Sequence, residues 1–118
     1  MQTVLRGIFL TCADPAETAK FYREIAGLDL EHLGNGAGGY WKIDRNGLQL
    51  AIHGARAFAD YADPPDRNSN LSHLYFKIED QAAFLGHLEN CMVKPYSTDD
   101  VVVTVEDPDG RKVMFGTA

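Results

Sequence analysis

The sequence predicts an α+β fold built from two tandem βαβββ modules. A segment that reads as a strand followed by a capped helix occurs twice, 66 residues apart, so that Gly7 corresponds to His73. Short apolar runs typical of β-strands follow the helix in both copies. Two similar turn sequences, at residues 44–47 and 107–110, stand 63 residues apart near the end of each copy. A repeat of this length within one short chain indicates two equivalent structural units.

The composition fits a single compact domain and disfavours several classes of partner. The chain has 118 residues, of which 45% are hydrophobic, so it can bury a real core. No stretch is long and apolar enough to span a bilayer, and no basic-then-apolar leader follows Met1. The net charge of −6 comes without a basic stripe, so we expect neither nucleic acid nor a membrane as partner. Cys12 and Cys91 lack metal-type spacing and fit a reducing compartment, so we expect a cytoplasmic protein.

The first module spans about residues 1–54 and begins with an apolar strand over residues 4–12. Asp14 then stands as an N-cap, Pro15 takes the first helical position, and Glu17 follows three residues after the cap. This arrangement predicts the start of a helix, which Gly27 ends. Three further strands are predicted over residues 28–33, 40–44 and 48–53, with Asn46 and Gly47 joining the last two as a hairpin.

A connector over residues 55–70 is the only long irregular segment of the sequence. Residues 55–61 could form a short helix, and Pro64, Pro65 and a polar run follow it. Such a segment is a plain linker in most domains, but it can also be a lid, here carrying Phe58 and Tyr61. The sequence leaves both interpretations open.

The second module spans about residues 71–118 and repeats the order of the first. Its first strand is predicted over residues 71–78, and Asp80 caps a helix that continues to Glu89. A short strand over residues 94–96 and a hairpin of strands 101–106 and 112–115 complete it.

Side-chain alternation assigns two faces to each predicted strand. One face is apolar and is the face that the helices cover. The opposite face carries Gln49, His53, His73 and Tyr75, a mixture of polar and aromatic groups. A solvated sheet face usually carries more lysine, glutamate and threonine, so this composition favours a small-molecule cavity. The same side chains could instead pack at a subunit interface.

The motifs of the two modules resemble those of a known superfamily. Asp14-Pro15 and Phe21-Tyr22 follow the first strand, and Asp-Pro-Asp-Gly at residues 107–110 precedes the last. With the repeat, the chain resembles, over essentially its whole length, the vicinal oxygen chelate superfamily of glyoxalase I, bleomycin-resistance proteins and extradiol dioxygenases. The resemblance implies that each module curls its strands into half of a mixed-sheet cup with helices outside. It also implies a homodimer, with modules paired either between chains or within one chain.

Metal-dependent members of that superfamily place ligands on the first and last strands of each module. Carried over by position, these sites are Gly7, Gln49 or Ala51, His73 and Met114. Neither choice in the first module supplies a carboxylate. Glycine offers no side chain, a thioether is too soft for a hard divalent ion, and an amide is a weak neutral ligand, so only His73 is a good one.

A rearranged set of Gln49, His53 and His73 is the remaining candidate for a divalent metal site. Three neutral ligands without an anion compete poorly for such an ion, so we expect no metal and no other cofactor. The dioxygenase reading is the least supported, because two members of its triad of two histidines and one carboxylate are missing.

The preferred hypothesis is a metal-free protein that binds a small organic ligand, a drug or a metabolite, as the resemblance to the bleomycin-resistance branch implies. Aromatic side chains could stack on a planar ligand, and the net negative charge would attract a cationic one. Trp41 could belong either to the pocket or to the core. The predicted pocket residues are Phe9, Trp41, Gln49, His53, His73, Tyr75 and Met114.

Two alternatives stay open. The first is a lyase or isomerase of the same fold, with or without a divalent metal. Its first candidate catalytic residue is His73, because histidine titrates near neutrality, and Glu106 is the candidate charged partner. The second is a dimeric domain whose cup is filled by its own side chains.

Overall fold

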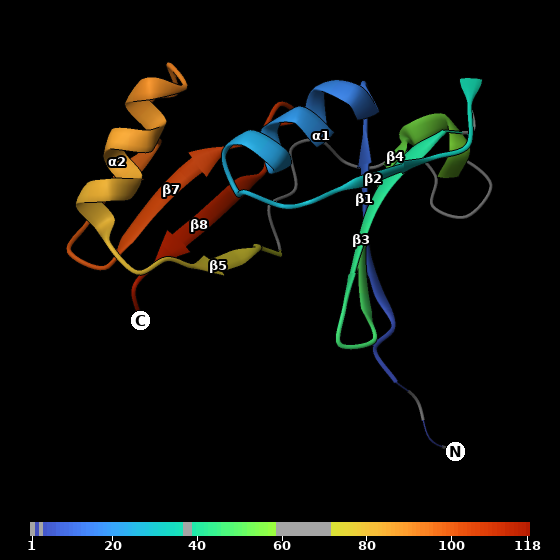
Figure 1. Cartoon of the computed structure of the whole chain (residues 1–118), viewed down its shortest axis with the longest axis horizontal. Helices are drawn as coiled ribbons and strands as arrows, with labels where there is room; N and C mark the ends of the chain where they lie inside the picture. Colours follow the sequence, from blue (N-terminus) through green and yellow to red (C-terminus); the bar gives the residue numbers. More distant parts are fainter. Residues whose placement is uncertain (1, 3, 37–38, 59–71) are drawn as a thin grey trace. The chain divides into compact units, whose positions relative to one another are not determined.

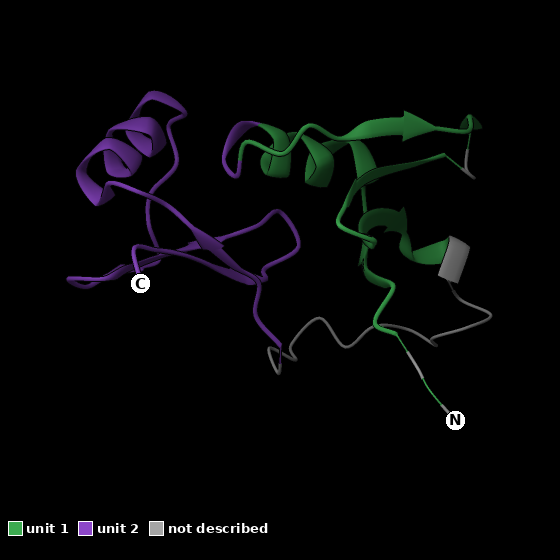
Figure 2. Cartoon of the chain, turned by 60° about the horizontal axis from the view of Figure 1, so that its bottom comes forward, with its two compact units in different colours: residues 1–23, 27–65 green, residues 24–26, 66–118 purple. Residues whose placement is uncertain are grey.

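The chain folds into two compact units, and the predicted α+β fold of two βαβββ modules is confirmed. The computed structural model describes residues 2, 4–36, 39–58 and 72–118. The first unit comprises Met1–Arg23 and Gly27–Pro65, and the second comprises Glu24–Ala26 and Asp66–Ala118 (Figure 2). Each unit has one four-stranded sheet. No helix among the described residues is long and apolar enough to cross a membrane.

The sheet of the first unit has the strand order β1-β4-β3-β2. β1 runs parallel to β4, and the other neighbours are antiparallel. Leu10, Tyr22 and Ile52 are buried in the core of this unit. The elements are β1 (Gly7–Cys12), α1 (Pro15–Glu24), β2 (Glu31–Leu33), β3 (Tyr40–Arg45), β4 (Leu48–Gly54) and the 3-10 helix η2 (Ala55–Phe58) (Figure 1).

The start of α1 follows the predicted cap. The Asp14 carboxylate accepts hydrogen bonds from the backbone N–H groups of Ala16 at 3.1 Å and Glu17 at 3.4 Å. These contacts satisfy amides that have no partner within the helix itself. Gly27 takes a left-handed φ of 69°, which suits a glycine after a helix end.

The second unit repeats the same arrangement with the strand order β5-β8-β7-β6. Asp80 caps its helix by accepting the Ala83 N–H at 3.0 Å. The Phe84 ring of that helix stacks on Phe115 with centroids 4.5 Å apart, so the helix covers the apolar face of the sheet. The elements are β5 (Tyr75–Lys77), α2 (Gln81–Asn90), β6 (Ser97–Thr98), β7 (Val102–Glu106) and β8 (Lys112–Gly116).

Several predicted boundaries were wrong. The strand predicted at residues 94–96 lies at Ser97–Thr98 instead, because the Asp99 carboxylate accepts the N–H groups of Val101 and Val102, both at 2.8 Å, and fixes a tight turn directly after it. The strand predicted over residues 71–78 is reduced to Tyr75–Lys77. The strand predicted over 28–33 is also shorter, because the chain bends where the Leu30 N–H donates to the Leu28 carbonyl at 3.1 Å.

The connector is only partly described. Its helix covers Ala55–Phe58 rather than residues 55–61. Tyr61 and the rest of residues 59–71, together with the Phe58 side chain, lie outside what the structure describes. The lid and linker interpretations therefore both stay predictions.

Strand register supports the repeat but corrects the alignment of the two turns. Phe9 pairs with Ala51 in the first sheet, as Tyr75 pairs with Met114 in the second. Asp44 pairs with Gln49, whereas the residue opposite Lys112 is Glu106. Glu106, and not Asp107, is therefore the counterpart of Asp44, because the second hairpin loop is longer than the two-residue turn of the first.

Candidate functional site

The first sheet has one face that α1 does not use. Residues paired in register point to the same side of a sheet, and neighbours along a strand alternate. Leu10 and Ile52 pair with each other on the buried side. The opposite side, which we name the open face of the first sheet, therefore carries the side chains of Phe9, Thr11, Tyr40, Lys42, Asp44, Gln49, Ala51 and His53.

Three aromatic side chains meet on this open face. The His53 imidazole lies parallel to the Tyr40 ring, with centroids 4.5 Å apart and an interplanar angle of 13°. The Phe9 ring meets His53 edge-on at 5.7 Å and is itself 53% exposed. Burial lowers the pKa of His53 below its ordinary value, so the imidazole is neutral at neutral pH. We call Phe9, Tyr40 and His53 the aromatic cluster.

Three polar side chains, those of Lys42, Asp44 and Gln49, lie beside the aromatic cluster on the same face. The Lys42 ammonium contacts the Asp44 carboxylate at 2.5 Å, and the Gln49 amide donates to the other Asp44 oxygen at 3.3 Å. The hydrogen bond from Lys42 lowers the pKa of Asp44, and the same bond raises the pKa of Lys42. Both groups are therefore charged, and Gln49 is held by a carboxylate.

Trp41 does not join the other predicted pocket residues of the first sheet. It pairs with Ile52 and His32, on the side opposite the open face. Its ring lies 4.6 Å from the His32 ring, and the Arg23 guanidinium stands 4.5 Å from its centroid. These contacts belong to the side of the sheet that α1 covers.

Tyr40 was missed by the sequence interpretation, although the hairpin could have revealed it. The turn at Asn46-Gly47 sets Arg45 opposite Leu48. Counting residues from this turn along β3 and β4 places Tyr40 opposite His53.

The second sheet places Tyr75 and Met114 together on its own open face, where they pair in register. The Tyr75 ring lies across Gly116, where an added Cβ would overlap the hydroxyl, and this hydroxyl donates to the Ala118 carbonyl at 3.0 Å. On the same face, the Lys112 ammonium contacts the Glu106 carboxylate at 2.6 Å. It also stands 4.3 Å from the centroid of the Tyr96 ring.

His73 stands just before β5 and is exposed. Its Nδ1 lies 3.3 Å from the backbone carbonyl oxygen of Lys112. Because a carbonyl oxygen only accepts, this contact is a hydrogen bond when Nδ1 carries the proton. In that tautomer Nε2 is the acceptor, as a general base requires.

The donor groups at the superfamily's ligand positions do not fit a divalent ion. Gly7 and Ala51 have no donor side chain, and the Gln49 amide is bound to Asp44. The rearranged set is not assembled either, because Gln49 and His53 are four residues apart on β4, about 13 Å along an extended strand. Within the described residues, no three His, Cys, Asp or Glu side chains gather in a way that could hold a metal.

Comparison with known families gives one match that covers nearly the whole chain. Residues 7–115 match the model of the glyoxalase-like domain. No curated protein sequence matches the chain.

Several solved structures share the fold at low sequence identity. A virulence protein from Salmonella typhimurium superposes with a TM-score of 0.73 at 15% identity, over 98% of this chain and 96% of that one. Lactoylglutathione lyase from Agrobacterium tumefaciens gives a TM-score of 0.66 at 18% identity, over 98% and 93%. An antibiotic binding protein from a Streptomyces strain gives 0.67 at 17% identity, over 98% and 95%.

Proposed function

The chain belongs to the glyoxalase-like domain family of the vicinal oxygen chelate superfamily, and on this premise we propose that it binds a small organic ligand, a drug or a metabolite, without a metal ion. The observation that carries this proposal is the aromatic cluster on the open face of the first sheet. Phe9 is half exposed there, beside the stacked pair of Tyr40 and His53. An exposed ring next to a stacked pair offers a surface on which a planar ligand can add a further ring.

The charge state of the cluster defines the ligand chemistry. A neutral imidazole is a better stacking surface for a cationic or neutral ring than a protonated one, which would repel a cation. The neighbouring Lys42 is neutralised by Asp44. The chain as a whole has a net charge of −6, which attracts a cation over longer distances. The proposed ligand is therefore planar, aromatic and neutral or cationic.

The second sheet supports the proposal with further amphipathic side chains. Tyr75 is 43% exposed and Tyr96 is 62% exposed. Exposed tyrosines supply apolar ring area together with a hydroxyl for hydrogen bonding, a combination common in binding sites. The similarity to an antibiotic binding protein agrees with a binding role but reflects the fold alone.

A thermal-shift screen of chelator-treated protein against planar aromatic cations and neutral aromatics tests the proposal. A ligand that binds the folded state raises the unfolding temperature by mass action. We expect the shift to be lost in Phe9→Ala and kept in the control Met92→Ala, which removes an exposed apolar side chain of the second unit. No stabilising compound across the panel would count against a binding function.

A lyase or isomerase using His73 is the second candidate, and one contact favours it. The Lys112 carbonyl orients the imidazole with Nε2 available as a base, and the ring is exposed to solvent. Loss of a lyase or isomerase activity in His73→Ala, with ligand binding retained, would support this candidate over simple binding. The homodimer and the cytoplasmic location belong to the proposal as well, and sedimentation of the purified chain tests the dimer.

A further inference from the structure

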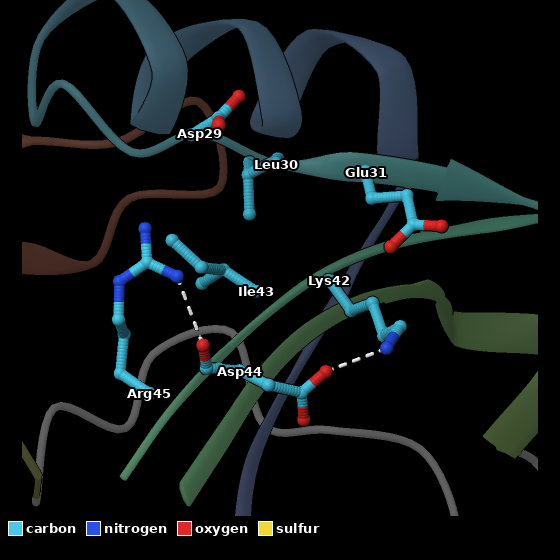
Figure 3. Close-up of a pocket in the computed structure, with 7 residues that line it drawn as sticks. All are labelled: Asp29, Leu30, Glu31, Lys42, Ile43, Asp44 and Arg45. Atoms are coloured by element: carbon cyan, nitrogen blue, oxygen red, sulfur yellow. Dashed lines mark hydrogen bonds and ion pairs between the residues drawn. The ribbon is translucent and has the colours of Figure 1, made fainter.

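The first unit holds a pocket that the proposed function does not use. It lies between the segment that leads into β2 and the end of β3, and its volume is about 480 Å³ (Figure 3). Pockets that bind small molecules generally measure about 300–1,000 Å³. Leu30 and Ile43 give the pocket its apolar surface. Charged side chains surround that surface, namely Asp29, Glu31, Lys42, Asp44 and Arg45.

The pocket exists because β2 leaves β3 before β3 ends. The two strands pair from Leu33 opposite Tyr40 to Glu31 opposite Lys42, and the ladder stops there. If it continued, Asp29 would stand opposite Asp44. Instead the Leu30 side chain turns into the core, where it is 8% exposed, and the chain bends away. The edge of β3 beyond Lys42 is therefore left without a neighbouring strand in the described part of the chain.

The backbone of Asp44 points into this gap. Arg45 and Leu48 close a two-residue turn, so they are the hydrogen-bonded pair of the hairpin. The next pair, Asp44 and Gln49, is then of the non-hydrogen-bonded type. The N–H and C=O groups of each residue point away from the partner strand of the hairpin. The Gln49 N–H accordingly donates to the Arg6 carbonyl at 2.8 Å, across the opposite edge of β4. The Asp44 N–H and C=O correspondingly face the pocket.

The Arg45 side chain covers the exposed carbonyl. Its guanidinium donates to the Asp44 backbone oxygen at 2.9 Å. Covering an open strand edge with a charged side chain is a common way to prevent unwanted strand pairing. In Figure 3 the Arg45 side chain stands at one end of the pocket, and Glu31 and Lys42 stand at the other.

The charges at the two ends differ in sign. Glu31 lies opposite Lys42, whose ammonium also pairs with Asp44. Two carboxylates of the pocket lining therefore share one ammonium at this end, which leaves one negative charge in excess. Among the described residues, no carboxylate lies within ion-pair distance of Arg45. A ligand that carries an ammonium group at the Glu31 end and a carboxylate at the Arg45 end matches this pattern.

We propose that this pocket binds a short zwitterionic peptide, which adds as a strand parallel to the end of β3. The parallel direction puts the peptide ammonium near Glu31 and its carboxylate near Arg45. The carbonyl of the first peptide residue accepts from the Asp44 N–H, and the N–H of the third residue donates to the Asp44 carbonyl. An apolar first side chain lies against Leu30 and Ile43.

Binding requires Arg45 to exchange its partner. The guanidinium releases the Asp44 carbonyl and takes the peptide carboxylate, which is the stronger, charge-assisted acceptor. The freed carbonyl then receives the N–H of the third residue. The Asp44 carbonyl thus has a partner both before and after binding, and the Asp44 N–H gains the carbonyl of the first peptide residue.

Titration calorimetry with the tripeptide Leu-Ala-Ala tests this proposal on the full chain. We expect binding with amide shifts at Asp44 and Arg45 in nitrogen-15 NMR spectra. Methylation of the third peptide nitrogen or amidation of the peptide carboxylate should each weaken binding about tenfold, as loss of a charge-assisted or edge hydrogen bond implies. Arg45→Gln should weaken it to a similar extent, and the matched control Arg56→Gln should not.

Three results would overturn the proposal: no heat and no amide shifts, equal affinity for the N-methylated peptide, or equal affinity for free leucine. The ligand modifications keep the test valid even if a variant folds poorly. The site is independent of the aromatic cluster, so Phe9→Ala should retain peptide binding. Failure of one proposal is therefore distinguishable from failure of the other.

Discussion

The imidazole of His53 lies flat against the ring of Tyr40, with centroids 4.5 Å apart. The two residues come from neighbouring strands joined by the hairpin turn at Asn46-Gly47, so their contact is set by the register of β3 and β4. The Tyr40 ring covers one face of the imidazole, and burial lowers the pKa of His53. The ring contact, the protonation state and the proposed ligand surface thus depend on one cross-strand pair.

Replacing Tyr40 with alanine should raise the pKa of His53 towards its ordinary value. The substitution removes the ring that covers the imidazole, so water can solvate the protonated form. NMR titration of the His53 ring protons measures this pKa directly. Tyr96→Ala in the second unit is the control and should leave it unchanged. An unaltered His53 pKa in Tyr40→Ala would mean that other groups cause the shift.

The lowered pKa of His53 also predicts how stability depends on pH. Since the folded pKa lies below that of the unfolded chain, the unfolded state binds more protons between the two values. The contribution to stability is complete above the unfolded pKa of about 6.5 and is lost as the pH falls through the folded pKa. Urea unfolding at pH 8 and pH 5 should show a larger loss in the wild type than in His53→Gln. Equal losses in both proteins would contradict this.

Gly116→Ala should displace the Tyr75 ring from the open face of the second sheet. An added Cβ would overlap the Tyr75 hydroxyl, which then loses its hydrogen bond to the Ala118 carbonyl. We expect the free energy of unfolding to fall by about 1 kcal/mol, the typical net value of one hydrogen bond. Gly54→Ala is the matched control, because its Cβ would meet Pro15 at an ordinary 3.5 Å. Equal stability of the two variants would argue against this role of Gly116.

Asp107→Ala should destabilise the hairpin between β7 and β8. The fully buried carboxylate accepts the backbone N–H groups of Asp109 at 2.8 Å and Arg111 at 2.9 Å, and it pairs with the Arg111 guanidinium at 2.9 Å. Removing one acceptor shared by three donors should cost about 2–4 kcal/mol in chemical denaturation. Asp109→Ala removes a carboxylate that stands farther from the same guanidinium, at 3.4 Å, and should cost much less. A similar loss of unfolding free energy in Asp107→Ala and Asp109→Ala would contradict the central position of Asp107 in the hairpin.

Much of the fold could be predicted from the sequence, because helix caps and hairpin turns depend on residues that are close together in the chain. Asp14 and Asp80 cap their helices as predicted, since a carboxylate three residues before an unpaired amide can reach it without help from the rest of the chain. Strand boundaries were harder to predict. The bend at Leu30 and the turn at Asp99 depend on hydrogen bonds and burial that apolar alternation does not reveal.

The site was predicted in part. Alternation correctly placed Phe9, Gln49 and His53 on one face of the first sheet, because strand geometry fixes that parity. It did not single out Tyr40, which requires counting both strands back from the hairpin turn. The pocket beside β3 could not be foreseen, since it arises where β2 leaves the ladder.

The most direct test of the central claim is the unfolding temperature of chelator-treated protein across the planar aromatic panel, measured for the wild type and for Phe9→Ala. At least one compound should raise the midpoint of the metal-free wild type and have little effect on Phe9→Ala. Stabilisation that requires added Ni, Zn, Mn or Fe and disappears in His73→Ala would contradict metal-free binding at the aromatic cluster.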